Sequence, residues 1–207
     1  LSLHDALPIY DAEEIDLSKF DFSKLTNMNN MFSQCDKLTS ISFGNIKPPL
    51  LRDMGAMFSE CRILASLNLS NFDTSLVTDM YRLFDACKEL ISLDLSNFNT
   101  SQVTDMHSMF YGCNKLKFLD ISSFNTSLVE NMESMFSGCS LLKTLNLSHF
   151  DTSKVTSMFL MFAYCSSLVS LDLSNFDTSQ VENMESMFFD CNSLGSLYIY
   201  IISILQK

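Results

Sequence analysis

The sequence has no tryptophan, and its 207 residues include three histidines, three prolines and five glycines. So few histidines and glycines leave little material for histidine-based catalysis or for a glycine-rich loop that binds phosphate. Basic residues are also scarce, with 13 Lys and Arg against 24 Asp and Glu. The net charge of −11 disfavours binding to nucleic acid or to anionic membranes. No apolar run reaches the length of about 18 residues that a membrane-spanning helix needs.

The seven cysteines lie at a constant spacing of 26 residues, from Cys35 to Cys191. A phenylalanine precedes each cysteine by three residues, and the 13 methionines occupy two columns, four and seven residues before the cysteines. The register holds without a gap over residues 15–199. Such a period predicts stacked units that share one core. We therefore predict a single domain of about seven repeats over residues 10–207.

Within each repeat the spacing of apolar residues changes. Segment 93–96 alternates apolar and polar residues, as a half-buried strand does, and equivalents recur in the other repeats. After a turn, Met106, Phe110 and Cys113 follow at helical spacing, and Gly112 lies where such a helix would end. The sequence thus predicts an α/β solenoid with one short parallel strand and one short helix per 26-residue repeat, curved with a concave sheet.

Residues 1–9 do not continue the repeat. Their sequence looks like the translation of a common sequencing adapter, so we interpret residues 1–9 as a non-native scar and exclude them from the fold argument. The alternative is an ordinary N-terminal cap.

The spacing Leu116-x-x-Leu119-x-Ile121, repeated every 26 residues, resembles a leucine-rich repeat. The fuller consensus Val-Thr-Asp-Met-x-x-Met-Phe-x-x-Cys-x-x-Leu-x-x-Leu-Asp-Leu-Ser-x-Phe-Asn-Thr is similar to the BspA-type leucine-rich repeat surface proteins, often labelled a domain of unknown function in mycoplasmas and other bacteria. The resemblance covers residues 15–199. It implies a curved solenoid that acts as an adhesin or binding protein on the cell surface or after secretion, with a protein or glycan ligand of unknown identity.

The cysteine and methionine columns are interpreted as core. Each cysteine has the same apolar position and none forms a C-x-x-C pair, which favours buried free thiols. Disulfides between neighbouring coils, or a metal or catalytic role, are the alternatives. The methionines share their spacing with phenylalanine and valine, which favours packing over a soft binding face or a copper site.

Side chains that point out of the predicted strands are the better candidates for binding, because the concave sheet is the usual binding surface of repeat proteins. Short hydroxyl and carboxylate groups there could bind sugars, a basic protein patch or cations, and the alternative is a solvated face. Phe118 is the one aromatic residue in the central run and is the expected hot spot. The candidates are Asn68, Asp94, Ser96, Phe118, Asp120, Ser122, Asn146 and Asp172.

Other polar columns are given structural interpretations. His107 and His149 have no partner at a recognisable catalytic spacing and are expected on the solvated surface. Asn68 and Asn146 fit the Asn-x-Ser signal but are expected within strands. The column expected to form turns contains Asp73, Asn99, Asn125, Asp151 and Asp177.

Three functional hypotheses remain. The first is a non-enzymatic binding module on a cell surface, and the second is an intracellular leucine-rich repeat scaffold for protein–protein interaction. The third is an enzyme, which the repetition of every polar column disfavours, because catalysis needs a singular constellation. We predict no catalytic residues, no metal ligands, no cofactor, no nucleic-acid partner and no direct membrane insertion.

Overall fold

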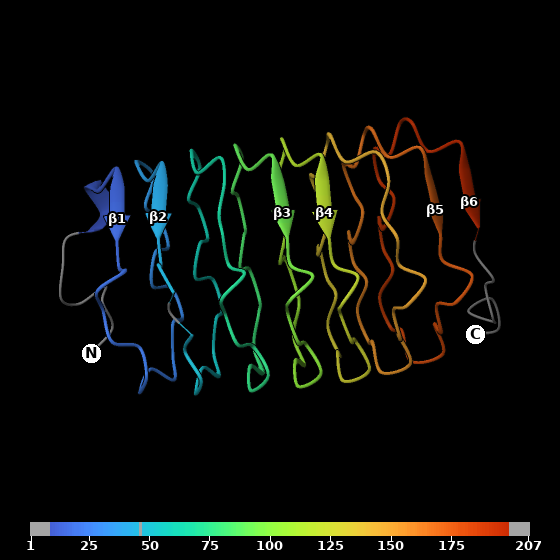
Figure 1. Cartoon of the computed structure of the whole chain (residues 1–207). Helices are drawn as coiled ribbons and strands as arrows, with labels where there is room; N and C mark the ends of the chain where they lie inside the picture. The colour runs from blue at the N-terminus through green and yellow to red at the C-terminus, as the bar shows by residue number, and fades with distance from the viewer. Residues whose placement is uncertain (1–8, 46, 199–207) are drawn as a thin grey trace.

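The computed structural model describes residues 9–45 and 47–198, and the chain winds as a row of similar coils (Figure 1). The first coils lie at one end of the row and the last coils at the other. A short 3₁₀ helix, η1 (Ile9–Asp11), begins the described chain. Neighbouring coils are related by 26 residues, so the solenoid that the period predicts is confirmed. Residues 1–8, which belong to the expected scar, lie outside the described residues. So do residues 199–207, which belong to the end of the expected domain.

Short strands lie at the same place in several coils and pair in parallel. Partner residues are one repeat apart, as Leu93 and Leu119 are. The described strands form three two-stranded sheets: β1 (Glu14–Asp16) with β2 (Ser40–Ser42), β3 (Ser92–Asp94) with β4 (Phe118–Asp120), and β5 (Ser170–Asp172) with β6 (Ser196–Tyr198). The parallel strand predicted for each repeat is thus present in some coils, while the curvature of the sheet stays a prediction.

The sheet is interrupted at two coils. Segments 66–68 and 144–146 stand where strands are expected, but neither forms a strand or an inter-coil backbone hydrogen bond. The placement of Asn68 and Asn146 within strands is therefore wrong. The amino-acid sequence could not reveal this difference. Segment 66–68 (Ser-Leu-Asn) and the strand segment 92–94 (Ser-Leu-Asp) differ only in having Asn or Asp at the third position.

The helix expected in each repeat is not confirmed, since η1 is the one helix among the described residues. Its place is taken by successive turns in which backbone N–H groups alternate between two kinds of acceptor. The N–H of Phe110 donates to the carbonyl of Met135 in the next coil (2.9 Å), whereas the N–H of Met109 donates three residues back to Met106 (3.2 Å). In an α-helix every such N–H donates to the carbonyl four residues earlier in the same helix, so these bonds could not join the coils in this way.

Two residues in each of these turn segments have a left-handed backbone, which an α-helix does not contain. In one coil they are Ser108 and Gly112, with φ of 54° and 67°. Gly138 has φ of 78°, so the left-handed backbone expected near Gly112 and Gly138 is confirmed, but it belongs to a turn. A left-handed conformation costs a residue with a side chain about 1–2 kcal/mol, and the bonds to the next coil offset this cost.

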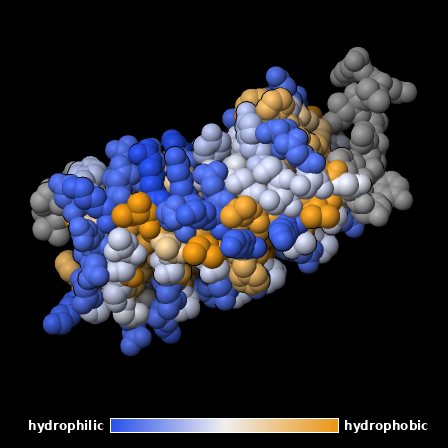
Figure 2. All heavy atoms as spheres, turned by 90° about the horizontal axis from the view of Figure 1, so that it is seen from above, coloured by the Kyte–Doolittle hydropathy of each residue, from blue (hydrophilic) through white to orange (hydrophobic). Residues whose placement is uncertain are grey.

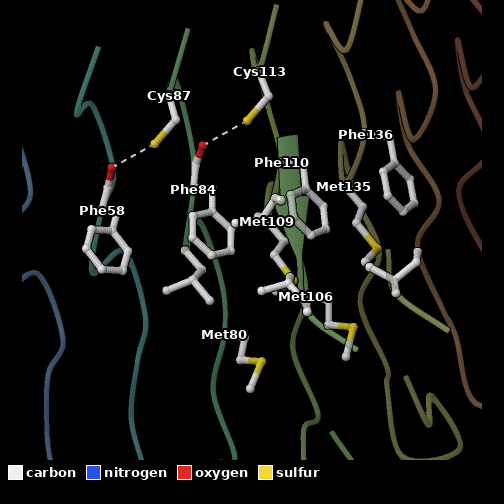
Figure 3. Packing of buried hydrophobic residues seen from close by; sticks show 14 of the residues in the cluster. Phe58, Met80, Phe84, Cys87, Met106, Met109, Phe110, Cys113, Met135 and Phe136 are labelled. Carbon is white, nitrogen blue, oxygen red and sulfur yellow. Dashed lines mark hydrogen bonds between the residues drawn. The ribbon is translucent and has the colours of Figure 1, made fainter. Parts of the chain in front are cut away.

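The core consists of columns that run through the coils. Phenylalanine rings from Phe32 to Phe188 stack with centroids 5.6 to 5.9 Å apart and interplanar angles of 17° or less. Figure 3 shows part of this column, from Phe58 to Phe136, beside the methionine side chains. Met106 and Met109 are fully buried, as are their equivalents in most other coils. The interpretation of the methionine columns as core is confirmed.

The cysteines form a ladder of free thiols, and all except the half-buried Cys191 are buried. The Sγ of Cys87 donates to the carbonyl oxygen of Phe58 and that of Cys113 to Phe84, each at 3.2 Å (Figure 3). The same bond, to the residue 29 positions earlier, recurs from Cys61 to Cys191 at 3.0 to 3.3 Å. The expected buried thiols are confirmed, and each one also links two coils.

Turns stabilised by a side-chain oxygen occur three times in a complete coil. In the coil that begins at β3, the Oδ1 atoms of Asp94, Asn99 and Asp105 each accept the N–H two residues ahead, at 2.9 to 3.0 Å. The middle position is the column expected to form turns, and this prediction is confirmed at Asp73, Asn99, Asn125, Asp151 and Asp177.

A column of buried threonines was not foreseen. The hydroxyl of Thr126 donates to the carbonyl of Asp151 and accepts the N–H of the same residue, both at 2.8 Å. Thr74 and Thr100 make the same pair of bonds with the next coil. Thr178, in the last described coil, is buried with no hydrogen-bond partner for its hydroxyl among the described residues.

Candidate functional site

The eight candidate residues lie on one side of the row, in or just after the strands and the unpaired segments 66–68 and 144–146; we call this side the strand face. Seven of them are exposed and Asp120 is half-buried. Asp94 and Asp120 are direct partners across β3 and β4. Asn146 follows in the next coil, and Asn68 and Asp172 lie one coil beyond this group, one at each end of it. The structure therefore brings Asp94, Phe118, Asp120 and Asn146 together in three successive coils.

The Asp and Asn candidates also have a structural role that the sequence interpretation missed. The Oδ1 atom of Asp120 accepts the N–H of Ser122 at 3.0 Å, and Asn146 makes the same bond to Ser148 at 3.1 Å. The hydrogen bonds from Ser96 hold the pKa of the Asp94 carboxyl below its usual range. One oxygen of each of these side chains therefore fixes the local turn.

A hollow of about 220 Å³ opens on the strand face beside β4. Its lining includes Phe118, Asp120, Asn146 and His149, and we call it the Phe118 hollow. Phe118 is 58% exposed, a high value for an aromatic ring. The hollow lies where β4 faces the unpaired segment 144–146, so the interruption of the sheet coincides with it.

His149 differs from the expectation of a solvated surface residue. It is half-buried, its Nε2 lies 3.0 Å from the carbonyl oxygen of Ile121, and its ring packs edge-on against Phe150. The imidazole thus bridges two coils at the base of the hollow. Sequence inspection could not show this, because the contact joins residues 28 positions apart.

A second hollow occupies the equivalent position three coils earlier. It also measures about 220 Å³ and is lined by Ser42, Gly44, Asn68 and Asn71, and we call it the Asn68 hollow. The Nδ2 of Asn71 donates to the carbonyl of Gly44 at 3.0 Å, in the place of the His149 contact. The two hollows lie at equivalent positions of the repeat, three coils apart. Serines stand at the Asn68 hollow where Phe118 and Asp120 stand at the other.

The strand face has charge of one sign. Among the described outward positions of the strands and of segments 66–68 and 144–146, no lysine or arginine occurs. The acidic side chains at these positions are Glu14, Asp16, Asp94, Asp120 and Asp172. This face therefore attracts cationic groups and repels anionic ones.

Another cluster lies on a different side of the coil. The Nδ1 of His107 is 2.8 Å from Asp105, and its ring stacks on Tyr81 with centroids 5.2 Å apart. Tyr81 lies over Gly55, where any side chain would collide with the ring, and Asn29 donates to its hydroxyl at 3.2 Å. His107 is thus part of an ordered cluster instead of the solvated residue expected.

Figure 2 looks down on the edge where the strands begin. Hydrophobic side chains occur there in several separate places among hydrophilic ones. Exposed examples among the residues that precede the strands are Ile91 and Val169. Scattered apolar side chains of this kind are ordinary on protein surfaces, so this edge does not by itself indicate an interface.

The described residues contain no group of three or more His, Cys, Asp or Glu side chains placed to hold a metal ion. None of their helices has the length and apolar character needed to cross a membrane.

The repeated coils match a known family along nearly the whole chain. Residues 6–118 and 106–198 match the family described as "Mycoplasma protein of unknown function, DUF285". The chain belongs to this family. The resemblance to the BspA-type, mycoplasma-associated repeat family is thereby confirmed. No curated protein matches this DUF285 chain.

Two solved structures are similar to this DUF285 chain. One is a leucine-rich repeat protein from Bacteroides ovatus, with 16% identity and a TM-score of 0.46. The other is a leucine rich cell surface protein from Faecalibacterium prausnitzii, with 19% identity and a TM-score of 0.41. Each match covers 90% of the DUF285 chain, which spans 60% and 59% of the two structures respectively.

Proposed function

We propose that this protein is a non-enzymatic binding module that recognises a macromolecule with its strand face, as an adhesin or interaction protein at the cell surface or outside the cell. The observation that carries the proposal is the 58% exposure of Phe118 in the Phe118 hollow. Apolar area left in water beside convergent polar groups is typical of binding sites. Phe118 is the most exposed of the large apolar side chains among the described residues, ahead of Phe189 at 55%, and it is the one that lies in a hollow of the strand face.

An enzymatic function is less well supported. The Asp and Asn side chains of the strand face recur from coil to coil, and each accepts a backbone N–H with one oxygen. A catalytic site needs a nucleophile, base or acid whose partners differ from those of its neighbours. The repetition therefore favours extended recognition over chemistry at one point.

The test is binding of the purified chain to a panel of extracellular-matrix proteins and glycans. The triple variant Asp94→Asn, Phe118→Ser, Asp120→Asn is measured alongside, because Asn and Ser already occupy these positions in other coils. We expect saturable binding to one panel member that the triple variant loses while its thermal melt is unchanged. A matched control outside the strand face, Phe189→Ser with Asp36→Asn and Asp190→Asn, changes exposed residues of the same types and should bind normally.

Two results would contradict the proposal. Equal binding by the triple variant and the parent would place any site elsewhere on the molecule. Absence of binding across the panel would favour the intracellular scaffold, which the seven free thiols favour because a reducing compartment keeps thiols free. Protease accessibility of the full-length protein on intact cells then decides between the two locations.

A further inference from the structure

The Phe118 hollow combines an aromatic face with negative charge. Phe118 and Asp120 are two residues apart on β4, so their side chains share the outward side of the strand. Asp94 is the partner of Asp120 on the neighbouring strand, about 5 Å away along the sheet. Asp120 lines the hollow beside the exposed ring, whereas Asp94 lies outside the lining, on the neighbouring strand, and adds to the negative charge around it.

We propose that the Phe118 hollow binds an arginine side chain from a basic segment of a partner protein. The guanidinium stacks on the Phe118 ring and pairs with the Asp120 carboxylate, and Asp94 adds a second negative charge. This inference rests on the proposed function, since it specifies the chemistry of the partner that the strand face recognises.

The carboxylate geometry favours a cationic donor. Oδ1 of Asp120 already accepts the N–H of Ser122, so the orientation of the carboxylate is fixed before any ligand arrives. Its Oδ2 has no hydrogen-bond partner among the described residues. A guanidinium can place an N–H on this oxygen while its plane covers the ring, and the compact ammonium of lysine cannot make both contacts as well.

The surroundings favour a basic protein segment over a glycan. The outward positions of the described strand face have five acidic residues and no basic one, and this charge favours the approach of a basic segment. A neutral sugar can donate hydrogen bonds to these carboxylates, but it has no net charge through which the face could attract it from a distance. Asn146 uses Oδ1 for its own turn, and its Nδ2 can donate to a backbone carbonyl of the bound segment.

The experiment uses a short fluorescent peptide of alternating arginine and serine, with lysine and citrulline versions as comparisons. Binding to the full chain is followed by fluorescence anisotropy at about 0.1 M salt, where charges beyond about 10 Å are screened. We expect the arginine peptide to bind most tightly. Phe118→Ser and Asp120→Asn should each weaken it about tenfold, because one removes the cation–π contact and the other the charge-assisted bond.

The chain supplies a matched control for charge. Asp172→Asn removes the same charge from the same column and keeps the same turn, but Ser170 stands there in place of an aromatic residue. It should change the affinity about twofold or less. A complementary variant, Ser40→Phe with Ser42→Asp, transfers both side chains to the Asn68 hollow and should add a second binding equivalent.

Four results would overturn the arginine proposal: an equal effect of Asp172→Asn and Asp120→Asn, equal affinity for the lysine peptide, no peptide binding, or no second equivalent in the complementary variant. The proposed function fails separately. One outcome would overturn the arginine assignment alone. In that outcome a panel glycan binds the parent chain but not the triple variant, and the arginine peptide does not bind; the strand face then recognises a sugar. If neither the peptide nor any panel member binds, both proposals fail.

Discussion

Phe110 and Phe188 have the same position in the repeat, three coils apart, but their surroundings differ. Phe110 lies between Phe84 and Phe136, with ring centroids 5.7 and 5.6 Å away, and is fully buried. Phe188 stacks on one described ring, that of Phe162, and is only partly buried. The comparison shows that each coil leaves its core open and that the following coil closes it.

The largest expected effect of this difference is on stability. Phe110→Ala should lower the free energy of unfolding by about 3–5 kcal/mol, because it removes a buried ring with contacts on both sides. Phe188→Ala should cost about half as much or less, since the ring loses one described neighbour. Urea unfolding followed by circular dichroism measures both. Equal losses would show that the two coils are covered to the same extent.

The threonine column gives a second, smaller contrast. Thr126→Val should cost about 1–3 kcal/mol, because it leaves the backbone N–H and carbonyl of Asp151 without their buried partner. Thr178→Val should change stability by about 0.5 kcal/mol or less, since the Thr178 hydroxyl has no described partner to lose. The same unfolding assay compares them. A loss at Thr178 as large as that at Thr126 would reveal a partner for its hydroxyl.

The smallest expected effect concerns the cysteine thiols, which should react with an alkylating reagent in a clear order. Burial raises the pKa of Cys191 less than it raises that of the fully buried Cys139. At pH 8 an alkylating reagent should therefore modify Cys191 first and Cys139 only after unfolding. Mass spectrometry of timed digests reads the order, and early labelling of Cys139 would contradict its burial.

The pH dependence of stability follows from the same burial. Burial raises the pKa of Cys35 to about 11, from an ordinary value of 9.0. The unfolded thiol therefore loses its proton at a lower pH than the folded one. The stabilising contribution is complete below about pH 9 and is lost as the pH rises through about 11, so the melting temperature should fall over that range.

Much of the fold could be predicted from the spacing alone. A constant column of cysteine, phenylalanine and methionine required stacked units, and the burial of Phe110, Met106 and Cys113 confirms their inward direction. The predicted helix was not confirmed, because successive turns return the same residues to the core at nearly helical spacing. The left-handed backbone of Ser108 distinguishes these turns from a helix. A serine in the sequence does not indicate a left-handed conformation.

The site was partly predictable. Phe118 stands out in the sequence because serine, threonine and glutamate occupy the same place in the other repeats. The hollow beside it could not be foreseen, since it depends on strand pairing that stops at segment 144–146. The contact of His149 between two coils was missed because its partner is the backbone carbonyl of Ile121. A backbone carbonyl is present at every residue, so the sequence does not point to this one.

The sequence distance between contacting coils has a consequence for how the chain folds. The backbone hydrogen bonds that join coils connect residues about one repeat apart, as Phe110 and Met135 are. Each new coil therefore closes a loop of the same modest size, whatever the length of the solenoid. Folding can begin wherever two adjacent coils first meet and can then extend in both directions.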